Sequence, residues 1–161
     1  LKELGTPCLI HQPSYNLMNR WVETDGLLDT LDELKIGSIA FTPLAQGLLT
    51  DKYLSKIPTD SRAMQGKSLD KTMISSNMMK NLNHLNDIAV ARGQTLAQMA
   101  ISWVLRKERV TSALIGASSA RQILDCVGAI ENPEFSRAEL EEIDRHAKEE
   151  SLNLWAKSAE L

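Results

Sequence analysis

The sequence lacks the features that mark secreted and membrane-spanning proteins. Only two cysteines occur, Cys8 and Cys126, and their wide separation excludes a disulfide framework and favours reduced thiols. No apolar run approaches the roughly 20 residues needed to cross a bilayer, and the first residues lack the basic and apolar parts of a secretory signal. We therefore expect a cytoplasmic protein with no membrane insertion.

Long basic runs are also absent. The chain carries 18 lysines and arginines against 21 acidic residues, a net charge of −3, which does not suit binding to a phosphate backbone. Nucleic acid is therefore excluded as an expected partner. The 161 residues, 43% of them apolar, are enough for one ordinary core. Because residues 1–4 resemble the last turn of a helix closed by Gly5, we expect the chain to be part of a longer protein.

Three short apolar segments predict β-strands: residues 8–10, 38–41 and 110–115. The first segment is short and continuous, which is typical of a buried strand. The first two segments are about 30 residues apart, the size of one βαβ unit, so we expect them to be parallel.

The spacing of apolar residues predicts helices between and after these strands. One amphipathic helix is expected over residues 21–34 and another near residues 79–92. Three further helices begin at capping-box patterns, which are Thr95 with Gln98, Ser119 with Gln122, and Ser136 with Glu139. Residues 43–72 show no period, and a connection of this length is usually functional or disordered.

This order of elements predicts an α/β fold with a parallel sheet. A complete TIM barrel needs about 250 residues, so the chain can form only part of one. Ligands of such folds bind at the carboxyl ends of the strands. The third strand is followed there by Gly116 and by a helix that opens near Ser119, where backbone amides suit an anion such as phosphate and Arg121 adds charge. Alternatively, Ser119 and Gln122 only cap the helix.

Several segments resemble the C-terminal half of an aldo-keto reductase. These are residues 41–53, 57–58, 61–62, 102–106 and 115–123, and the resemblance extends over nearly the whole chain. It is greatest for the branch that contains bacterial glyceraldehyde 3-phosphate reductases and the β-subunits of voltage-gated potassium channels. The resemblance implies that residues 1–161 form a single unit, which supplies the sixth to eighth strands and the C-terminal helices of a TIM barrel.

The resemblance also implies a cofactor, NADP(H), bound across the carboxyl face of the barrel. Gln12 then matches the glutamine that binds the nicotinamide carboxamide, and Phe41 the aromatic ring that stacks on the nicotinamide. The remaining matches are Thr42, Pro43, Leu44, Ala45 and Gln46 along the pyrophosphate, Lys52 and Arg62 in a basic belt over the phosphates, and Gly116, Ser118, Gln122, Asp125 and Cys126 around the adenosine and its 2′-phosphate.

Two of these positions depart from the family pattern. Cys126 stands where an asparagine usually meets the adenine, and a thiol is a poor substitute donor. Asp125 is shorter than the usual glutamate.

The family's catalytic aspartate, tyrosine, lysine and histidine belong to the first half of the barrel, and none of those motifs is found here. Tyr15 and Tyr53 match non-catalytic places, and we interpret His11 as positional. His84 and His146 are expected on solvated helix surfaces, and no cysteine and histidine spacing suits a metal.

Three hypotheses follow. In the first, the parent protein is an NADP-dependent oxidoreductase that reduces small aldehydes or ketones, and this chain supplies much of the cofactor site but is inactive alone. In the second, the chain is a non-catalytic nucleotide-binding module that regulates a partner, as a channel β-subunit does. In the third, it is a structural unit that forms homo-oligomers through an exposed flank of the sheet. The physiological substrate is not encoded in these residues.

Overall fold

The computed structural model describes residues 2–55 and 74–147, and these contain a three-stranded sheet in the order β1-β2-β3. The strands are β1 (Ile10–His11), β2 (Gly37–Phe41) and β3 (Ser112–Leu114). Both pairs are parallel, which confirms the predicted arrangement. The pairing of β2 with β3 is distant in sequence, since the Ser38 amide donates to the Thr111 hydroxyl across 73 positions.

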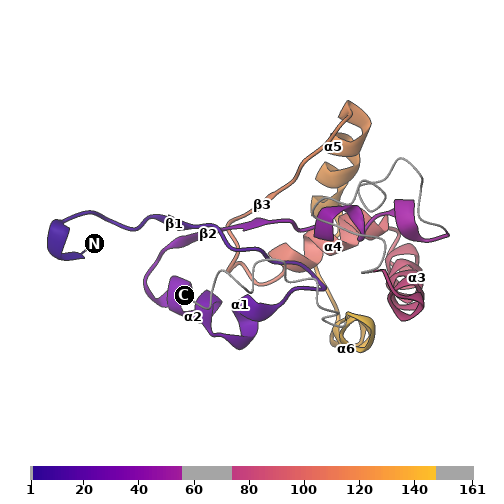
Figure 1. Cartoon of the computed structure of the whole chain (residues 1–161), viewed down its shortest axis with the longest axis horizontal. Coiled ribbons are helices and arrows are strands. Elements are labelled where there is room, and N and C mark those ends of the chain that lie inside the picture. Colours follow the sequence, from indigo (N-terminus) through magenta and orange to yellow (C-terminus); the bar gives the residue numbers. More distant parts are fainter. Residues whose placement is uncertain (1, 56–73, 148–161) are drawn as a thin grey trace.

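Helices connect and follow these strands (Figure 1). The α-helices are α1 (Trp21–Thr24), α2 (Leu27–Glu33), α3 (Ser76–Ala91), α4 (Leu96–Leu105), α5 (Ala120–Val127) and α6 (Arg137–His146). Short 3-10 turns are η1 (Lys2–Leu4), η2 (Ala45–Gly47), η3 (Asp51–Tyr53) and η6 (Gly128–Glu131). The strand and helix order confirms the predicted α/β class.

The single helix predicted over residues 21–34 is wrong, because the chain forms two helices there. α1 ends at Thr24 and α2 begins at Leu27. Gly26 between them has φ +73°, a left-handed conformation that glycine adopts without steric cost. The apolar period continues across this break, so periodicity alone did not reveal it.

The prediction of a buried first strand is also wrong. β1 begins at Ile10, and both of its residues are exposed, Ile10 by 58%. Within the described residues, β1 pairs only with β2, so one of its edges is open. Burial of a strand depends on what covers it, and sequence pattern alone does not supply that information. In contrast, β2 alternates, with Ser38 and Ala40 fully buried on the face that the helices cover.

The core lies where α4 packs on β3 and on α3, which in turn packs on α6. Trp103, Leu82, Met99 and Ile143 have no exposed surface. In Figure 1, α1, α2 and α6 lie below the strands, whereas α5 projects above them. The inner residues of α4 are almost all buried, as expected for a helix between a sheet and two other helices.

Two of the three predicted capping boxes are confirmed, those of Thr95 with Gln98 and Ser136 with Glu139. At the third, Ser119 accepts from the Gln122 amide, but the Gln122 side chain accepts from the Ser118 amide instead of that of Ser119. The box is therefore half formed, because the Gln122 side chain is bound to Ser118, one residue before the N-cap. Both cysteines are free.

Candidate functional site

The carboxyl ends of the three parallel strands lie at one edge of the sheet. The chain enters β1 from the left in Figure 1, so this edge faces right, toward α3 and α4. Gln12 follows β1 directly and is exposed, while Phe41 ends β2 and is half-buried. Ser118 lies four residues beyond the end of β3. The structure thus places the predicted nicotinamide-binding residues, Gln12 and Phe41, at the ends of adjacent strands.

The loop that follows β2, residues 42–47, has an unusual backbone. Four of its residues have positive φ: Thr42 (56°), Ala45 (46°), Gln46 (59°) and Gly47 (98°). For residues with a side chain this conformation is uncommon, and for β-branched threonine it is an outlier. Each such residue costs of order 1–3 kcal/mol and persists only where its surroundings hold it, most often at ligand sites.

Two buried side chains from the segment after β1 hold this loop. Ser14 Oγ lies 2.9 Å from Thr42 Oγ1, and Asn16 Nδ2 donates to the Thr42 carbonyl at 2.9 Å. Ser14 is 5% exposed and Asn16 4%. Sequence reasoning did not single out either residue for this role, because the contacts join segments that are separate in the chain.

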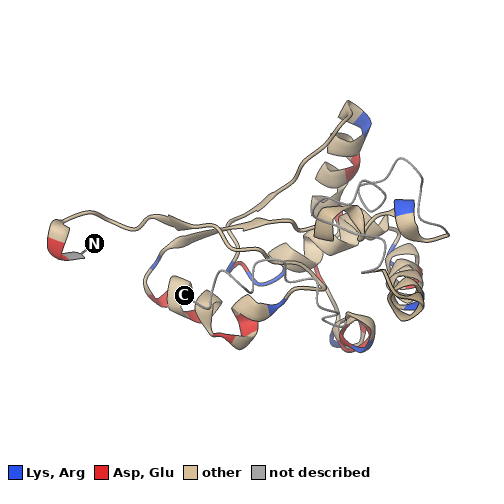
Figure 2. Cartoon of the chain, in the orientation of Figure 1, with Lys and Arg blue, Asp and Glu red and all other residues tan. Residues whose placement is uncertain are grey.

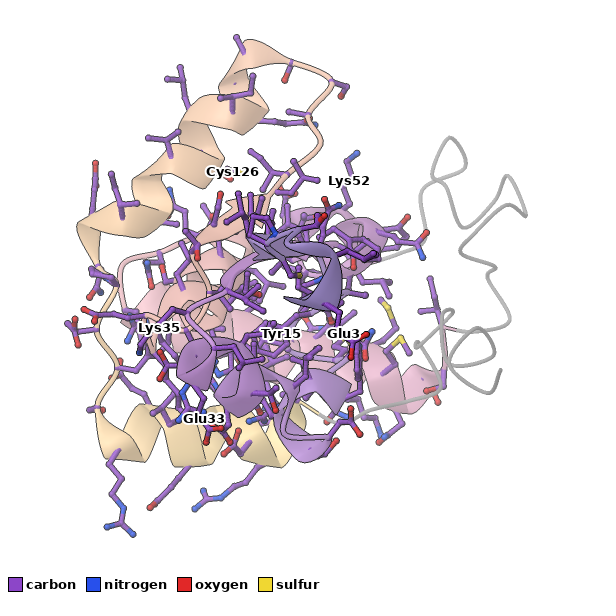
Figure 3. The ribbon with its side chains drawn as sticks, turned by 90° about the vertical axis from the view of Figure 1, so that its left-hand side faces the viewer. Glu3, Tyr15, Glu33, Lys35, Lys52 and Cys126 are labelled. Carbon is purple, nitrogen blue, oxygen red and sulfur yellow. The ribbon has the colours of Figure 1, made fainter. Side chains whose placement is uncertain are left out.

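Lys52 is connected to the same loop through Thr50. The Thr50 hydroxyl accepts from the Lys52 amide and donates to the Gly47 carbonyl at 2.7 Å. This cap fixes η3 next to the loop, and Figure 3 shows Lys52 at the periphery of the chain, with Tyr15 in the interior. Within η3, Lys52 directly follows the acidic Asp51. Arg62, the second predicted basic residue, lies outside the described residues.

The segment after β3 is open to solvent. Gly116 and Ser118 are exposed, and a Cβ at Gly116 would meet nothing within 4 Å. Gln122 Oε1 accepts from the Ser118 amide at 2.8 Å and lies 3.1 Å from its hydroxyl. The beginning of α5 therefore projects as an ordered, exposed turn, and Arg121 makes it basic (Figure 2).

Asp125 and Cys126 are engaged with α4. The Thr95 hydroxyl lies 3.3 Å from both carboxylate oxygens of Asp125. Cys126 is 9% exposed, and burial, with the nearby charge of Asp125, raises the pKa of its thiol. The thiol lines an open pocket of about 310 Å³ between α4, β3 and α5. Cys126 forms a small apolar cluster with Ile101 and Ala129, and Leu44 of the 42–47 loop packs against this cluster.

Sequence reasoning missed a cluster of charged and aromatic side chains beneath the segment after β1. Tyr15 donates to Glu23 Oε1 at 2.6 Å, and Arg106 donates to both the Tyr15 hydroxyl (2.9 Å) and Glu23 Oε1 (2.5 Å). Arg20 donates to the other Glu23 oxygen at 2.9 Å. These contacts bring the start of α1 to the end of α4. No local sequence motif predicts them.

The cluster perturbs two titrations. Burial alone would raise the pKa of Glu23, but hydrogen bonds from Tyr15 and Arg106 and the charges of Arg106 and Arg20 outweigh it and lower the pKa to about 2. Burial, aided by the hydrogen bond to Glu23, raises the pKa of Tyr15 above its ordinary value although the Arg106 charge opposes this. The Tyr15 hydroxyl is therefore a fixed structural donor.

The Trp103 ring contacts both arginines of this cluster. The guanidinium carbon of Arg106 is 3.6 Å from the Trp103 ring centroid, and that of Arg20 is 4.7 Å away. The Tyr15 ring is 5.4 Å from the same ring. These ring contacts anchor residue 15, and so fix the segment that carries Ser14 and Asn16.

The histidines lie away from the edge residues, apart from His11 in β1, which is exposed. His84 is on the surface of α3, as predicted, but its ring stacks on that of His146 at 4.4 Å, and His146 is half-buried against Glu142. Over residues 2–55 and 74–147, no group of three histidine, cysteine or acidic side chains is arranged to hold a metal. In the same part of the chain, no helix is long and apolar enough to cross a membrane.

Comparisons with known proteins identify the family to which the sequence is similar. Residues 1–148 match the profile of the aldo/keto reductase family. The chain is 52% identical over 164 aligned residues to L-glyceraldehyde 3-phosphate reductase of Escherichia coli strain K12, covering 99% of this chain and 47% of the relative. The same enzyme of Escherichia coli O157:H7 gives the same identity and coverage. The chain thus spans about half the length of these relatives.

The fold resembles that of a solved family structure. A thermostable aldo-keto reductase, Tm1743, in complex with the inhibitor epalrestat superposes with a TM-score of 0.60 at 22% sequence identity, covering 87% of this chain and 40% of the other. The likeness confirms the predicted fold class, an α/β structure that forms part of a TIM barrel.

Proposed function

Because the chain belongs to the aldo/keto reductase family, we propose that its sheet edge forms part of the NADPH site of a reductase that converts small aldehydes or ketones to alcohols. Residues 1–161 would supply the sixth to eighth strands of that barrel as one unit. Bound NADPH would supply the hydride that reduces the carbonyl carbon.

The residues present fit this cofactor. The amide of Gln12 is exposed and can pair with the nicotinamide carboxamide, and the half-buried ring of Phe41 keeps a face for stacking. Thr42, Pro43, Leu44, Ala45 and Gln46 would follow the pyrophosphate, and Lys52 and Arg62 would neutralise phosphate charge. Gly116, Ser118 and Gln122 would surround the adenosine and its 2′-phosphate. Asp125 and Cys126 would lie beside them, although the Asp125 carboxylate already contacts Thr95 and the Cys126 thiol is buried.

One observation supports the proposal most strongly. The 42–47 loop directly follows Phe41 and is fixed in a costly left-handed conformation by buried groups. A sequence under no functional demand would relieve that cost with glycine or a longer turn. The loop is therefore shaped in advance for a ligand at the end of β2.

The proton that completes carbonyl reduction would come from a residue outside this chain. Tyr15 is bound to Glu23 and Arg106, and Tyr53 is 2% exposed, so neither hydroxyl is placed to serve a substrate at the sheet edge. We expect the isolated chain to show no aldehyde-dependent oxidation of NADPH.

A fluorescence titration of the chain with NADPH tests the proposal. Lys52→Met should weaken binding roughly tenfold, since a charge-assisted hydrogen bond contributes about 1.5 kcal/mol or more. Lys35→Met is the matched control, because Lys35 is exposed before β2, at the opposite edge of the sheet. Absence of NADPH binding by the folded chain, or equal losses in the two variants, contradicts the assignment.

The engaged tyrosines are equally compatible with a second candidate, a module that binds nucleotide without turnover and regulates a partner. The two candidates differ in the full-length protein. Joined to its natural N-terminal part, an enzyme oxidises NADPH when an aldehyde is added, whereas a regulatory module binds NADPH and does not.

A third candidate rests on the uncovered sheet face. Ile10 (58% exposed) and Leu114 (51%) lie on the same face, and β1 and β3 are edge strands within the described part of the chain. A second copy would cover this surface and make a homo-oligomer. Light scattering, which measures the molar mass, distinguishes this candidate from the other two when it is done with and without NADPH. A dimer that does not depend on NADPH supports this candidate, and a monomer contradicts it.

A further inference from the structure

The most strained described residue with a β-branched side chain, Thr42, is held by a hydrogen-bond chain whose direction can be deduced. The Thr42 hydroxyl donates its one hydrogen to the Phe41 carbonyl at 2.7 Å, so it can only accept from Ser14, 2.9 Å away. Ser14 in turn accepts from Asn19 Nδ2 at 3.1 Å. The chain therefore runs from Asn19 through Ser14 and Thr42 to the Phe41 carbonyl.

The Thr42 carbonyl is fixed as well. It accepts from Asn16 Nδ2 at 2.9 Å and from the Ala45 amide at 3.0 Å. Asn16 is itself immobilised, because its Oδ1 accepts from the Met18 amide at 2.9 Å and its backbone exchanges two hydrogen bonds with Asn19. Both polar groups of Thr42 are thus bound to one rigid turn that follows β1.

This turn is built to face the loop. Residues 13–15 continue the parallel pairing beyond β1, since the Phe41 amide donates to the Pro13 carbonyl and the Tyr15 amide to the Phe41 carbonyl. Side chains alternate along such a segment. Ser14 and Asn16 consequently point toward Thr42, whereas Tyr15 points to Arg106 and Trp103 in the interior.

We propose that Ser14 and Asn16 are positioning residues, which preset the 42–47 loop in the conformation that binds the cofactor. The inference rests on the proposed function of this edge as an NADPH site. The two side chains touch no cofactor in this role. They act through Thr42. Because they order the loop before the cofactor binds, they lower the entropic cost of binding.

Amide hydrogen exchange of the ligand-free chain provides a test that does not depend on NADPH. The reporters are loop amides with backbone acceptors, those of Ala45, Gly47 and Leu48. Asn16→Ala and Thr42→Val should each raise their exchange rates at least tenfold. Thr42→Ser, which keeps the hydroxyl, should exchange within twofold of the natural chain, and amides of α4 should be unchanged in all variants.

Asn16→Ala is then titrated with NADPH. We expect Asn16→Ala to weaken binding about tenfold. Thr24→Ala, which removes an exposed hydroxyl of α1 away from the loop, is titrated as the control and should bind normally. Unchanged loop exchange in Asn16→Ala overturns the inference, as does faster exchange with unaltered NADPH affinity. If Asn16→Ala fails to fold, the loop exchange rates of ligand-free Thr42→Val against those of Thr42→Ser decide. If the natural chain does not bind NADPH, the proposed function is overturned. If the natural chain and every variant bind NADPH equally well, only the positioning role is overturned.

Discussion

Arg106 and Glu23 are 83 positions apart in the sequence, and Nη2 of Arg106 lies 2.5 Å from Oε1 of Glu23. The Arg106 side chain is 7% exposed and that of Glu23 22%. Because Tyr15 bonds to both, this pair connects the turn after β1 to the end of α4. It thereby supports the residues that hold the 42–47 loop.

Removing one partner of this pair should destabilise the fold. Arg106→Met leaves the Glu23 carboxylate in a partly buried place without its main partner, and we expect the free energy of unfolding to fall by about 3 kcal/mol. Arg109→Met is the matched control, because the Arg109 pair with Asp29 is exposed and should contribute under about 1 kcal/mol. Urea unfolding measures the loss of stability in both variants. Equal losses would show that the pair of Arg106 and Glu23 contributes no more than an exposed ion pair.

The lowered pKa of Glu23, about 2, predicts how stability depends on pH. Its pKa in the unfolded chain is near 4.3. A carboxyl with a depressed folded pKa contributes stability above the unfolded value, and that stability is lost as pH falls from about 4.3 toward 2. Glu23→Gln should therefore flatten the fall in unfolding free energy over this range. An unaltered slope in urea titrations of the variant would contradict the assignment.

Gly128, at the start of η6, faces the capping glutamine of α4. A Cβ at this position would lie 2.5 Å from Nε2 of Gln98. Gly128→Ala should displace Gln98, which donates to the Asp125 carbonyl and accepts from the Thr95 amide, and cost about 1–2 kcal/mol.

Two companion variants test this explanation by thermal unfolding. Gly116→Ala places its methyl group in open space and should change stability by less than about 0.5 kcal/mol. The double change Gly128→Ala with Gln98→Ala should cost less than the sum of the single changes, since both act on one contact. Strict additivity would place the strain elsewhere.

The two thiols should differ in reactivity. Cys8 is exposed, whereas Cys126 is buried with a raised pKa, and a thiolate is the reactive form. A disulfide reagent at pH 8 should therefore label Cys8 rapidly and Cys126 at least tenfold more slowly. Cys8→Ser should remove the rapid phase alone. Loss of the slow phase in that variant would reverse the assignment.

Local signals in the sequence were sufficient for the parts of the fold that local contacts determine. The capping boxes at Thr95 and Ser136 involve residues only three apart and formed as predicted, although the equally local box at Ser119 formed in half. The parallel order of the strands followed from their spacing. The common edge that carries Gln12 and Phe41 followed from the same order. The use of these residues in binding stays a prediction.

Contacts between distant segments could not be predicted in this way. The exposure of Ile10 depends on what lies beside β1, and the pairing of Arg106 with Glu23 depends on how α4 meets α1. The positive φ of Thr42 is equally invisible, since threonine is an unfavourable residue for it and is held there by Ser14 and Asn16. Sequence pattern marks the loop as irregular but not as rigid.

The pairing of β2 with β3 has a consequence for the route by which the chain reaches this structure. The Ser38 amide and the Thr111 hydroxyl must meet across 73 intervening steps of chain, whereas α3 and α4 need only nearby partners. Closing so large a loop lowers the entropy of the chain before the contacts of the sheet can compensate for that cost. We expect the helical hairpin to assemble first on refolding, with the strands joining in a slower phase of roughly milliseconds to seconds.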